Sequence, residues 1–172
     1  GCIELNVWTS RKDTTDKPDY LVLDMDPSDN NTFEDVILTA QTVKKVMDKA
    51  KVKGYCKTSG SSGIHIYIPA GAKYSFEQVK DFAHVMMQLV QKEIPDITTL
   101  ERNLQKRDKG KTYLDYLQNR RGQTLASVYS LRPKNGAPVS MPIEWDELKT
   151  GLKPTDFNIE NALQRIEQKG DI

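Results

Sequence analysis

Two aspartates separated by one residue, Asp24 and Asp26, end an apolar run at residues 21–23 and are followed by Pro27. Such a run predicts a buried strand, in which residues two apart leave the same face with Cα atoms about 6 to 7 Å apart. Carboxylates this close repel each other and lose solvation, and a divalent cation with oxygen ligands relieves both costs. We therefore predict a metal site, in its sharper form two Mg²⁺ or Mn²⁺ ions about 3.5 to 4 Å apart, as phosphoryl transfer uses. The alternative is a solvated strand end whose acids cap the next helix.

A loop of serine and glycine occupies residues 59–63, with Ser59, Gly60, Ser61 and Gly63 as candidate ligands. Hydroxyls and free backbone N–H groups in a bend form a nest that binds phosphate oxygens. Alone, this composition is a weak signal, and the segment that follows has to strengthen it.

That segment, residues 64–68, alternates isoleucines with other residue types. Because alternate residues of a strand face opposite sides, the isoleucines fill one face and His65 lies with Tyr67 on the other. His65 is thus expected to point away from the apolar layer. The alternative is a buried structural histidine that is satisfied by a backbone carbonyl.

A third acid, Asp115, interrupts the strand-like run at residues 112–117 and is able to complete the metal cage. The stretch around it is basic, since residues 101–121 hold seven Lys or Arg against three acids in a chain of net charge +1. Charge runs are more often solvated faces than binding sites. Further along, Arg132 is a candidate for bidentate contact with phosphate oxygens.

The elements that must position these residues follow from periodicity and turn signals. A helix is expected over residues 33–51, capped by Asn31 or Thr32, and another from residue 74 or 75 to Pro95. Strands are expected at residues 3–8, 21–26, 55–58, 64–68, 112–117 and 124–128, with a hairpin-like turn at 59–63.

The C-terminal part, with Trp145, Leu148 and residues 158–166, has the pattern of two short helices separated by Gly151 and Pro154. Hairpin-like joins break the alternation of strands and helices along the chain. We therefore predict a mixed α/β fold of the α+β type, with a largely antiparallel sheet flanked by helices.

The composition is that of an ordinary globular domain, with 172 residues of which 37% are apolar and 28% charged. No apolar stretch approaches the roughly 20 residues of a membrane-spanning helix, and no secretory signal pattern is present. The two cysteines, Cys2 and Cys56, are too few for a metal cage and are expected to be reduced thiols. We expect one cytoplasmic domain with no membrane partner.

Together these constellations resemble the polymerase domain of bacterial DNA ligase D, in the archaeo-eukaryotic primase superfamily. The resemblance covers essentially all 172 residues. A D-x-D pair, an S-G-x-x-G-x-H segment and a later strand aspartate in this order are hard to obtain by chance. The matching residues are Gly1-Cys2-Ile3-Glu4, Trp8, Ser10-Arg11, Pro18-Asp19, Leu23-Asp24-Met25-Asp26-Pro27, Thr58-Ser59-Gly60, Gly63-Ile64-His65, Leu114-Asp115-Tyr116, Gln118-Asn119, Tyr129-Ser130-Leu131-Arg132, Pro138-Val139-Ser140 and Trp145-Asp146-Glu147-Leu148.

The resemblance implies a primase-like catalytic core that acts as a template-directed nucleotidyltransferase in non-homologous end joining of broken DNA. Such an enzyme adds ribonucleotides by preference, or deoxynucleotides, to a DNA 3′ end, with Mn²⁺ favoured. By position, Asp24 and Asp26 would bind both metals, and Asp115 would join the catalytic ion near the primer 3′-OH.

The same resemblance implies the residues that hold the incoming nucleotide. These would be Ser59 and His65, with Gln118 and Arg132 as further nucleotide-site residues. The implied partners are NTP or dNTP, DNA ends with a template strand, a ligase domain and the end-binding Ku protein. The implied location is the bacterial cytoplasm, at the nucleoid during repair.

Two departures from the family are visible. Many relatives carry a lysine in the loop where this chain has Ser62, so that Arg132, Lys109, Lys111 or the metals must neutralise the triphosphate. Relatives also have a further segment before the position of Gly1, which helps to grip the template and its 5′-phosphate. We therefore expect residues 1–172 to form a single catalytic domain without this segment, with weakened or lost binding of DNA ends.

Two other functions are compatible with parts of the pattern. Residues 24–28 satisfy the D-x-D-x-[ST] motif of haloacid-dehalogenase phosphatases, in which Asp24 would be a covalent nucleophile. The downstream lysine and paired acids of that class are not found in convincing places. A nucleic-acid-binding module without catalysis is the second alternative, and it would tolerate the loss of Asp24 or Asp26.

Overall fold

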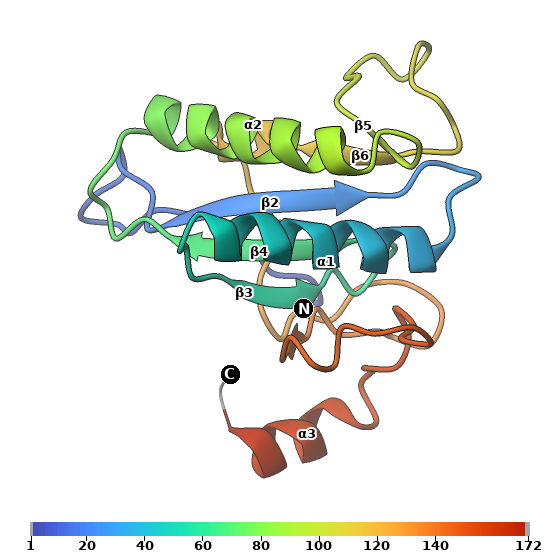
Figure 1. The fold of residues 1–172 in the computed structure, drawn as a ribbon. Coiled ribbons are helices and arrows are strands. Elements are labelled where there is room, and N and C mark those ends of the chain that lie inside the picture. Colours follow the sequence, from blue (N-terminus) through green and yellow to red (C-terminus); the bar gives the residue numbers. More distant parts are fainter. Residues whose placement is uncertain (1, 171–172) are drawn as a thin grey trace.

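The computed structural model describes residues 2–170, so Gly1 of the opening motif and residues 171–172 lie outside the described part. Its main sheet consists of β2 (Tyr20–Asp26), β3 (Tyr55–Thr58), β4 (Ile64–Pro69), β5 (Thr98–Thr99), β6 (Thr112–Asp115) and β8 (Pro142–Ile143). These six strands have the order β5-β6-β2-β4-β3-β8 (Figure 1). The β5–β6 pair is parallel and the other neighbouring pairs are antiparallel, which confirms the predicted sheet.

Two long helices, α1 (Phe33–Lys49) and α2 (Phe76–Glu93), pack on one face of the sheet (Figure 1). Each begins at a capping box, where a cap residue and the third helical residue bond each other's backbone N–H groups. The pairs are Thr32 with Asp35 and Ser75 with Gln78, so both helix starts agree with the sequence analysis.

The two faces of the sheet differ because residues along each strand alternate. Leu21, Leu23 and Met25 of β2 lie in the core against the helices, and the isoleucines of β4 do the same. Burial of each such side chain contributes about 1.5 to 3 kcal/mol, so a slip of one residue, which would expose them all, is strongly disfavoured. The packing of these residues therefore fixes Asp24 and Asp26 on the face away from the helices.

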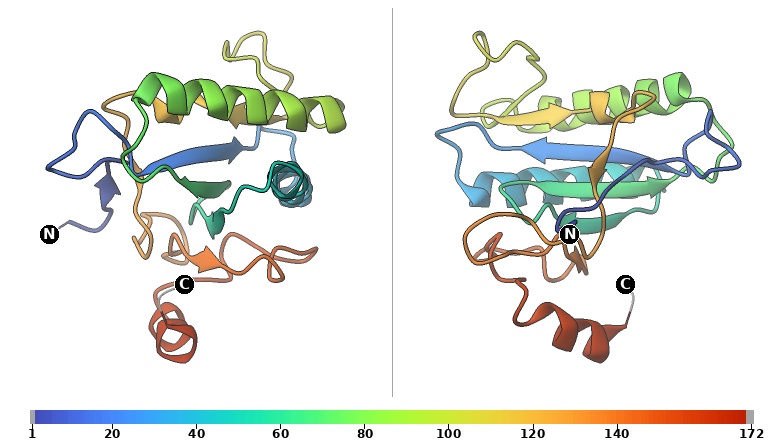
Figure 2. Two further views of the ribbon diagram at one scale, coloured as in Figure 1. Left: turned by 60° about the vertical axis from the view of Figure 1, so that its left-hand side comes forward. Right: turned by 180° about the vertical axis from the view of Figure 1, so that it is seen from behind.

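That second face is crossed by the N-terminal segment and by the chain around residues 125–128 (Figure 2). Here β1 (Asn6–Val7) pairs with β7 (Leu125–Ala126) in a separate two-stranded sheet. The helix α3 (Ala162–Lys169) lies at the far end of the molecule, where Ala162 packs with Val139 and Met141.

The short elements differ from the predictions. Strand β6 ends at Asp115 and not at residue 117, because Asp115 Oδ1 accepts the N–H of Leu117 at 2.7 Å and turns the chain. A 3-10 helix, η1 (Leu117–Asn119), follows. The predicted strands at 3–8 and 124–128 shrink to the two-residue strands β1 and β7.

The prediction of two C-terminal helices is wrong in part. Residues around Trp145 and Leu148 form turns, in which Glu147 N–H donates to Glu144 O and Lys149 N–H donates to Glu147 O. They still contribute to packing, with Leu148 buried and Trp145 Nε1 donating to Gly54 O at 3.1 Å. Of the helices described within residues 2–170, none is long and apolar enough to cross a membrane.

Candidate metal and nucleotide site

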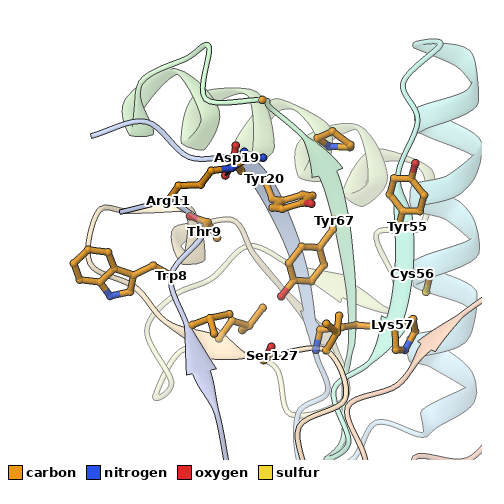
Figure 3. A pocket seen from close by; sticks show the side chains of 16 residues that line it. Trp8, Thr9, Arg11, Asp19, Tyr20, Tyr55, Cys56, Lys57, Tyr67 and Ser127 are labelled. Atoms are coloured by element: carbon orange, nitrogen blue, oxygen red, sulfur yellow. Dashed lines mark hydrogen bonds and ion pairs between the residues drawn. The ribbon is translucent and has the colours of Figure 1, made fainter. Parts of the chain in front are cut away.

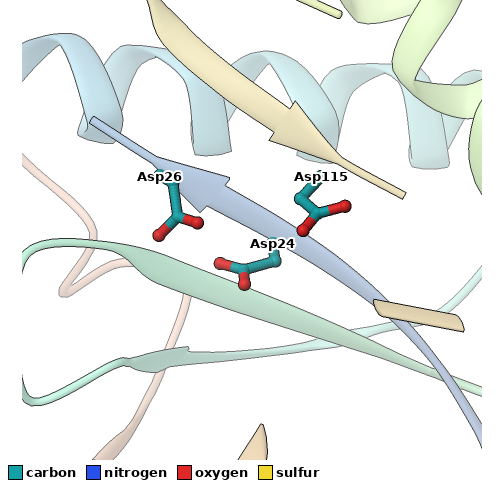
Figure 4. Close-up of side chains that lie close together, drawn as sticks. All are labelled: Asp24, Asp26 and Asp115. Carbon is teal, nitrogen blue, oxygen red and sulfur yellow. The ribbon is translucent and has the colours of Figure 1, made fainter. Parts of the chain in front are cut away.

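Three carboxylates meet on the sheet face away from the helices (Figure 4). Asp24 and Asp26 lie at the end of β2, and Asp115 ends β6 directly opposite Asp24 in the antiparallel register. One carboxylate oxygen of each residue lies within 4.8 Å of the corresponding oxygens of the other two. The structure thus brings together the three acids that the sequence analysis singled out.

The negative charge of this triad is poorly compensated. Burial, followed by the charges of Asp26 and Asp115, raises the pKa of Asp24 well above its usual value. Burial and the charge of Asp115 raise the pKa of Asp26, and burial raises that of Asp115. Among residues 2–170, Asp24 Oδ1 has no hydrogen-bond donor. Converging carboxylates, one of them with a buried oxygen that has no donor, fit a hard divalent cation, so these residues suit the metal that the sequence predicts.

A row of polar side chains crosses the sheet at the level of Asp24. The register places Asp115, Asp24, His65 and Lys57 side by side on β6, β2, β4 and β3. Directly opposed residues of antiparallel strands point to the same face, so His65 lies off the apolar layer as expected. Its Nε2 is 3.3 Å from Asp24 Oδ1, without the geometry of a hydrogen bond. Burial, with the cations Lys57 and Arg132, holds the pKa of His65 well below its usual value.

Lys57 is a residue of this row that the sequence analysis missed. It is only 2% exposed, and its Nζ donates to the Oγ of Ser140, which donates in turn to Thr58 O. Burial lowers the pKa of Lys57 to about 7, although the charge of Asp24 opposes this. A single lysine in a short strand carries no signal in the sequence, because its burial depends on a distant segment that covers it.

The serine-glycine loop between β3 and β4 is closed by its own hydrogen bonds. Ser59 Oγ accepts the N–H groups of Ser61 at 3.1 Å and Gly63 at 3.0 Å, and Ser59 N–H donates to Gly63 O at 2.9 Å. These N–H groups, expected to be free for phosphate, are therefore engaged within the turn. Gly60 has a φ of +67°, and a Cβ on Gly63 would lie 2.5 Å from Met25 O, so both positions need glycine.

Arg132 lies at the edge of this loop. Its Nη1 donates to Ser59 O at 2.6 Å, and its Nε donates to Glu4 Oε2 at 2.9 Å. Hydrogen bonds from Asn6 and Arg132 lower the pKa of Glu4, as expected for an ion pair. The two contacts hold the guanidinium beside the loop that the sequence analysis assigned to phosphate.

Gln118 and the basic stretch approach the triad from the other side. Gln118 Oε1 is buried and has no hydrogen-bond partner within the described residues. The loop before β6 carries Arg107, whose guanidinium lies 3.7 Å from the centroid of the Tyr113 ring. Because Tyr113 is opposite Asp26, one cation of the basic stretch reaches the triad, and Arg107 opposes the effect of burial on the pKa of Asp26.

A cavity of about 520 Å³ lies on the same face, toward the N-terminal end of β2 (Figure 3). Its walls include Trp8, Tyr20, Tyr55 and Tyr67, and Lys57 lies at the side nearer the triad. None of the three aspartates lines it. The cavity is therefore a neighbour of the candidate metal site and not the site itself.

The phosphatase alternative is wrong. That class requires a later acidic motif after a parallel strand, whereas β2 is antiparallel to both of its neighbours, β4 and β6. The third acid comes from β6, which contributes it across an antiparallel pair.

Comparisons with known proteins identify the family of this chain. The family described as "LigD, primase-polymerase domain" matches residues 1–172. The multifunctional non-homologous end joining protein LigD of Pseudomonas aeruginosa is 29% identical over 168 residues, which are 98% of this chain and 20% of that protein. The bifunctional LigD of Bacillus subtilis is 31% identical over 155 residues, 90% of this chain and 25% of the relative. The chain thus spans a fifth to a quarter of these relatives.

A solved structure is similar as well. The polymerase domain of Mycobacterium tuberculosis ligase D in complex with DNA matches with a TM-score of 0.82 and 26% identity. The match covers 91% of this chain and 54% of that domain. The fold of this chain is therefore that of the solved polymerase domain.

Repulsion within the triad predicts that removing one carboxylate stabilises the metal-free protein and weakens metal binding. Replacing Asp24 with Asn removes one buried carboxylate, and we expect the free energy of unfolding of the metal-free protein to rise by about 0.5 to 2 kcal/mol. The same change should abolish the increase in melting temperature that Mn²⁺ gives the unchanged chain. Calorimetry in EDTA and in Mn²⁺ measures both effects, with the exposed Asp13→Asn as control. A destabilised Asp24→Asn protein would contradict the prediction.

The buried ammonium of Lys57 predicts a pH dependence of stability. Between the folded pKa of about 7 and the unfolded value of 10.5, the unfolded chain binds one more proton than the folded chain. The free energy of unfolding should therefore rise with pH in this window, by up to about 1.4 kcal/mol per pH unit from this group. Urea titrations of metal-free protein at pH 7 to 10 should show a smaller slope for Lys57→Met. Equal slopes would show that Lys57 titrates normally.

Proposed function

The chain belongs to the LigD primase-polymerase family, and we propose that it is the catalytic part of a polymerase that repairs DNA breaks by non-homologous end joining. The observation that carries the proposal is the meeting of Asp24, Asp26 and Asp115 beside the loop at residues 59–63. Phosphoryl transfer requires positioned reactants and neutralised charge more than covalent chemistry from the protein. A carboxylate triad next to a loop with hydroxyls and an arginine supplies both requirements.

Two divalent cations, Mn²⁺ or Mg²⁺, would be held by the triad. Asp24 and Asp26 would bind both ions, and Asp115 would bind the ion near the primer 3′-OH. When bound, such ions lower the pKa of an attacking hydroxyl and neutralise charge on the leaving group. The role of the protein is to hold the carboxylates in place, through the β2–β6 register and the Leu117 N–H that donates to Asp115.

The incoming nucleotide, a ribonucleotide by preference or a deoxynucleotide, would lie between the triad and the loop. Ser59 and His65 would contact its phosphates, and Arg132 would add a fixed positive charge. Gln118 Oε1, without a partner within residues 2–170, would accept a hydrogen bond from the ligand. The neutral imidazole of His65 would then act as a hydrogen-bonding group and not as a cation.

The DNA end would lie against the basic residues 101–121, which concentrate positive charge next to the triad. The similar solved domain is in complex with DNA, which supports DNA as a partner of this chain. The multifunctional and bifunctional relatives support a ligase domain as a partner. The end-binding Ku protein would be a further partner, as the resemblance to the family implies. The protein would then work at the bacterial nucleoid.

Primer extension with labelled ribonucleotides and Mn²⁺ tests the proposed function. Asp115→Ala should lower the rate of nucleotide addition by about 10³-fold or more, because each lost metal ligand removes several kcal/mol of transition-state stabilisation. The matched control Asp13→Ala should keep the unchanged rate. If Asp115→Ala and Asp24→Ala remain active, or if the unchanged chain binds DNA but adds no nucleotide, a non-catalytic binding module is favoured instead.

Because position 62 is a serine, we predict that a cation placed there strengthens triphosphate binding. Ser62 is exposed on the loop, so Ser62→Lys adds a cation near the phosphates at little cost in stability. We expect KM for the nucleotide to fall about 2- to 5-fold at low salt with kcat nearly unchanged, and the gain to shrink as salt is added. Steady-state kinetics of Ser62→Lys and of the uncharged Ser62→Gln separate charge from side-chain length. An equal effect of both would contradict the role of charge.

A further inference from the structure

We propose that Asn119 is a positioning residue for the metal centre, because its carboxamide ties the turn after Asp115 to β2 just before Asp24. The proposal rests on the function proposed above, since it concerns how the same triad is held. It assigns a role to a residue whose side chain bonds backbone atoms of Val22 and Tyr116.

Three hydrogen bonds support this role. Asn119 Oδ1 accepts the N–H of Val22 at 2.8 Å, and Asn119 Nδ2 donates to Val22 O at 2.7 Å and to Tyr116 O at 2.9 Å. Asn119 is only 1% exposed, so water cannot reach it to replace these hydrogen bonds. The carboxamide therefore joins the backbone of β2 to the backbone of the turn that follows Asp115.

The three hydrogen bonds of Asn119 form a clamp that bonds β2 where strand β6 has already ended. In the β2–β6 register Asp24 is opposite Asp115, so continuing the ladder would set residue 117 opposite Val22. The chain has already left the strand there and forms η1. Val22 lies two residues before Asp24, so its N–H and C=O point to the same side of β2 as those of Asp24. The carboxamide presents one acceptor and one donor to this pair, as a neighbouring strand would.

Asp115 needs such support because it is the last residue of a four-residue strand. Strand ends open more easily than strand centres, and a metal centre loses affinity when one ligand moves. With the clamp, the segment from Asp115 to Asn119 is fixed to β2 at both ends. Gln118 lies inside this segment, so the clamp also sets the position of its Oε1, which has no hydrogen-bond partner among residues 2–170.

Mn²⁺ binding provides the test, measured by the electron paramagnetic resonance signal of free Mn²⁺ on the full chain. For Asn119→Ala we expect affinity to fall about 10- to 100-fold, the range seen when residues that orient metal ligands are changed. Nucleotide addition should lose kcat, with KM for the nucleotide changed less. Hydrogen exchange of the Val22 amide should become faster in the variant.

A variant of smaller effect and a control keep the test decisive. If Asn119→Ala does not fold, Asn119→Ser, which is too short to make all three bonds, is measured in its place. Trp145→Phe removes a side-chain bond to Gly54 O on the far side of the sheet, and it should lower the melting temperature without changing Mn²⁺ affinity. An Asn119 variant that folds, binds Mn²⁺ as the unchanged chain does and keeps its kcat overturns the proposal. Failure of the unchanged chain to bind Mn²⁺ would instead overturn the proposed function.

Discussion

Three carboxylates held within 4.8 Å of one another, largely out of water, are the interaction on which this structure depends. Left alone they repel, and burial raises the pKa of all three. The folded chain tolerates this because the hydrophobic core on the other face of the sheet holds the strands in one register. Repulsion among buried carboxylates at one defined place marks a site suited to a cation. A binding function explains this destabilising cluster better than a contribution to stability does.

The sheet positions the polar side chains of the candidate site. Its antiparallel register places residues from four strands in one row, with acids at one end and the buried Lys57 at the other. Neutral His65 separates the two charges. The row therefore runs from carboxylates to an amine across a few strand widths of about 4.8 Å each. This polarity suits a ligand that carries metal ions at one end and negative charge along its length.

The loop and the arginine that flank this row are already ordered. The turn at residues 59–63 is closed by Ser59, and Arg132 is held between Ser59 O and Glu4. Groups fixed in advance lose less entropy when a ligand binds than groups that must be ordered. The contact with Glu4 also connects the N-terminal segment to the loop, so that residues distant in sequence share one binding surface.

Patterns in the sequence alone determine the site's chemical identity. The D-x-D pair, the serine-glycine loop, the histidine on the polar side of an alternating strand and the later aspartate are local patterns, so they can be recognised without coordinates. The helices at Phe33–Lys49 and Phe76–Glu93 are likewise local, because caps and 3.6-residue periodicity act within a few turns. The tertiary structure decided what depends on distant partners: the burial of Lys57, the clamp by Asn119, the two-residue strands and the turn at Trp145. Only folding shows which strand pairs with which, because that choice balances contacts from many separate segments.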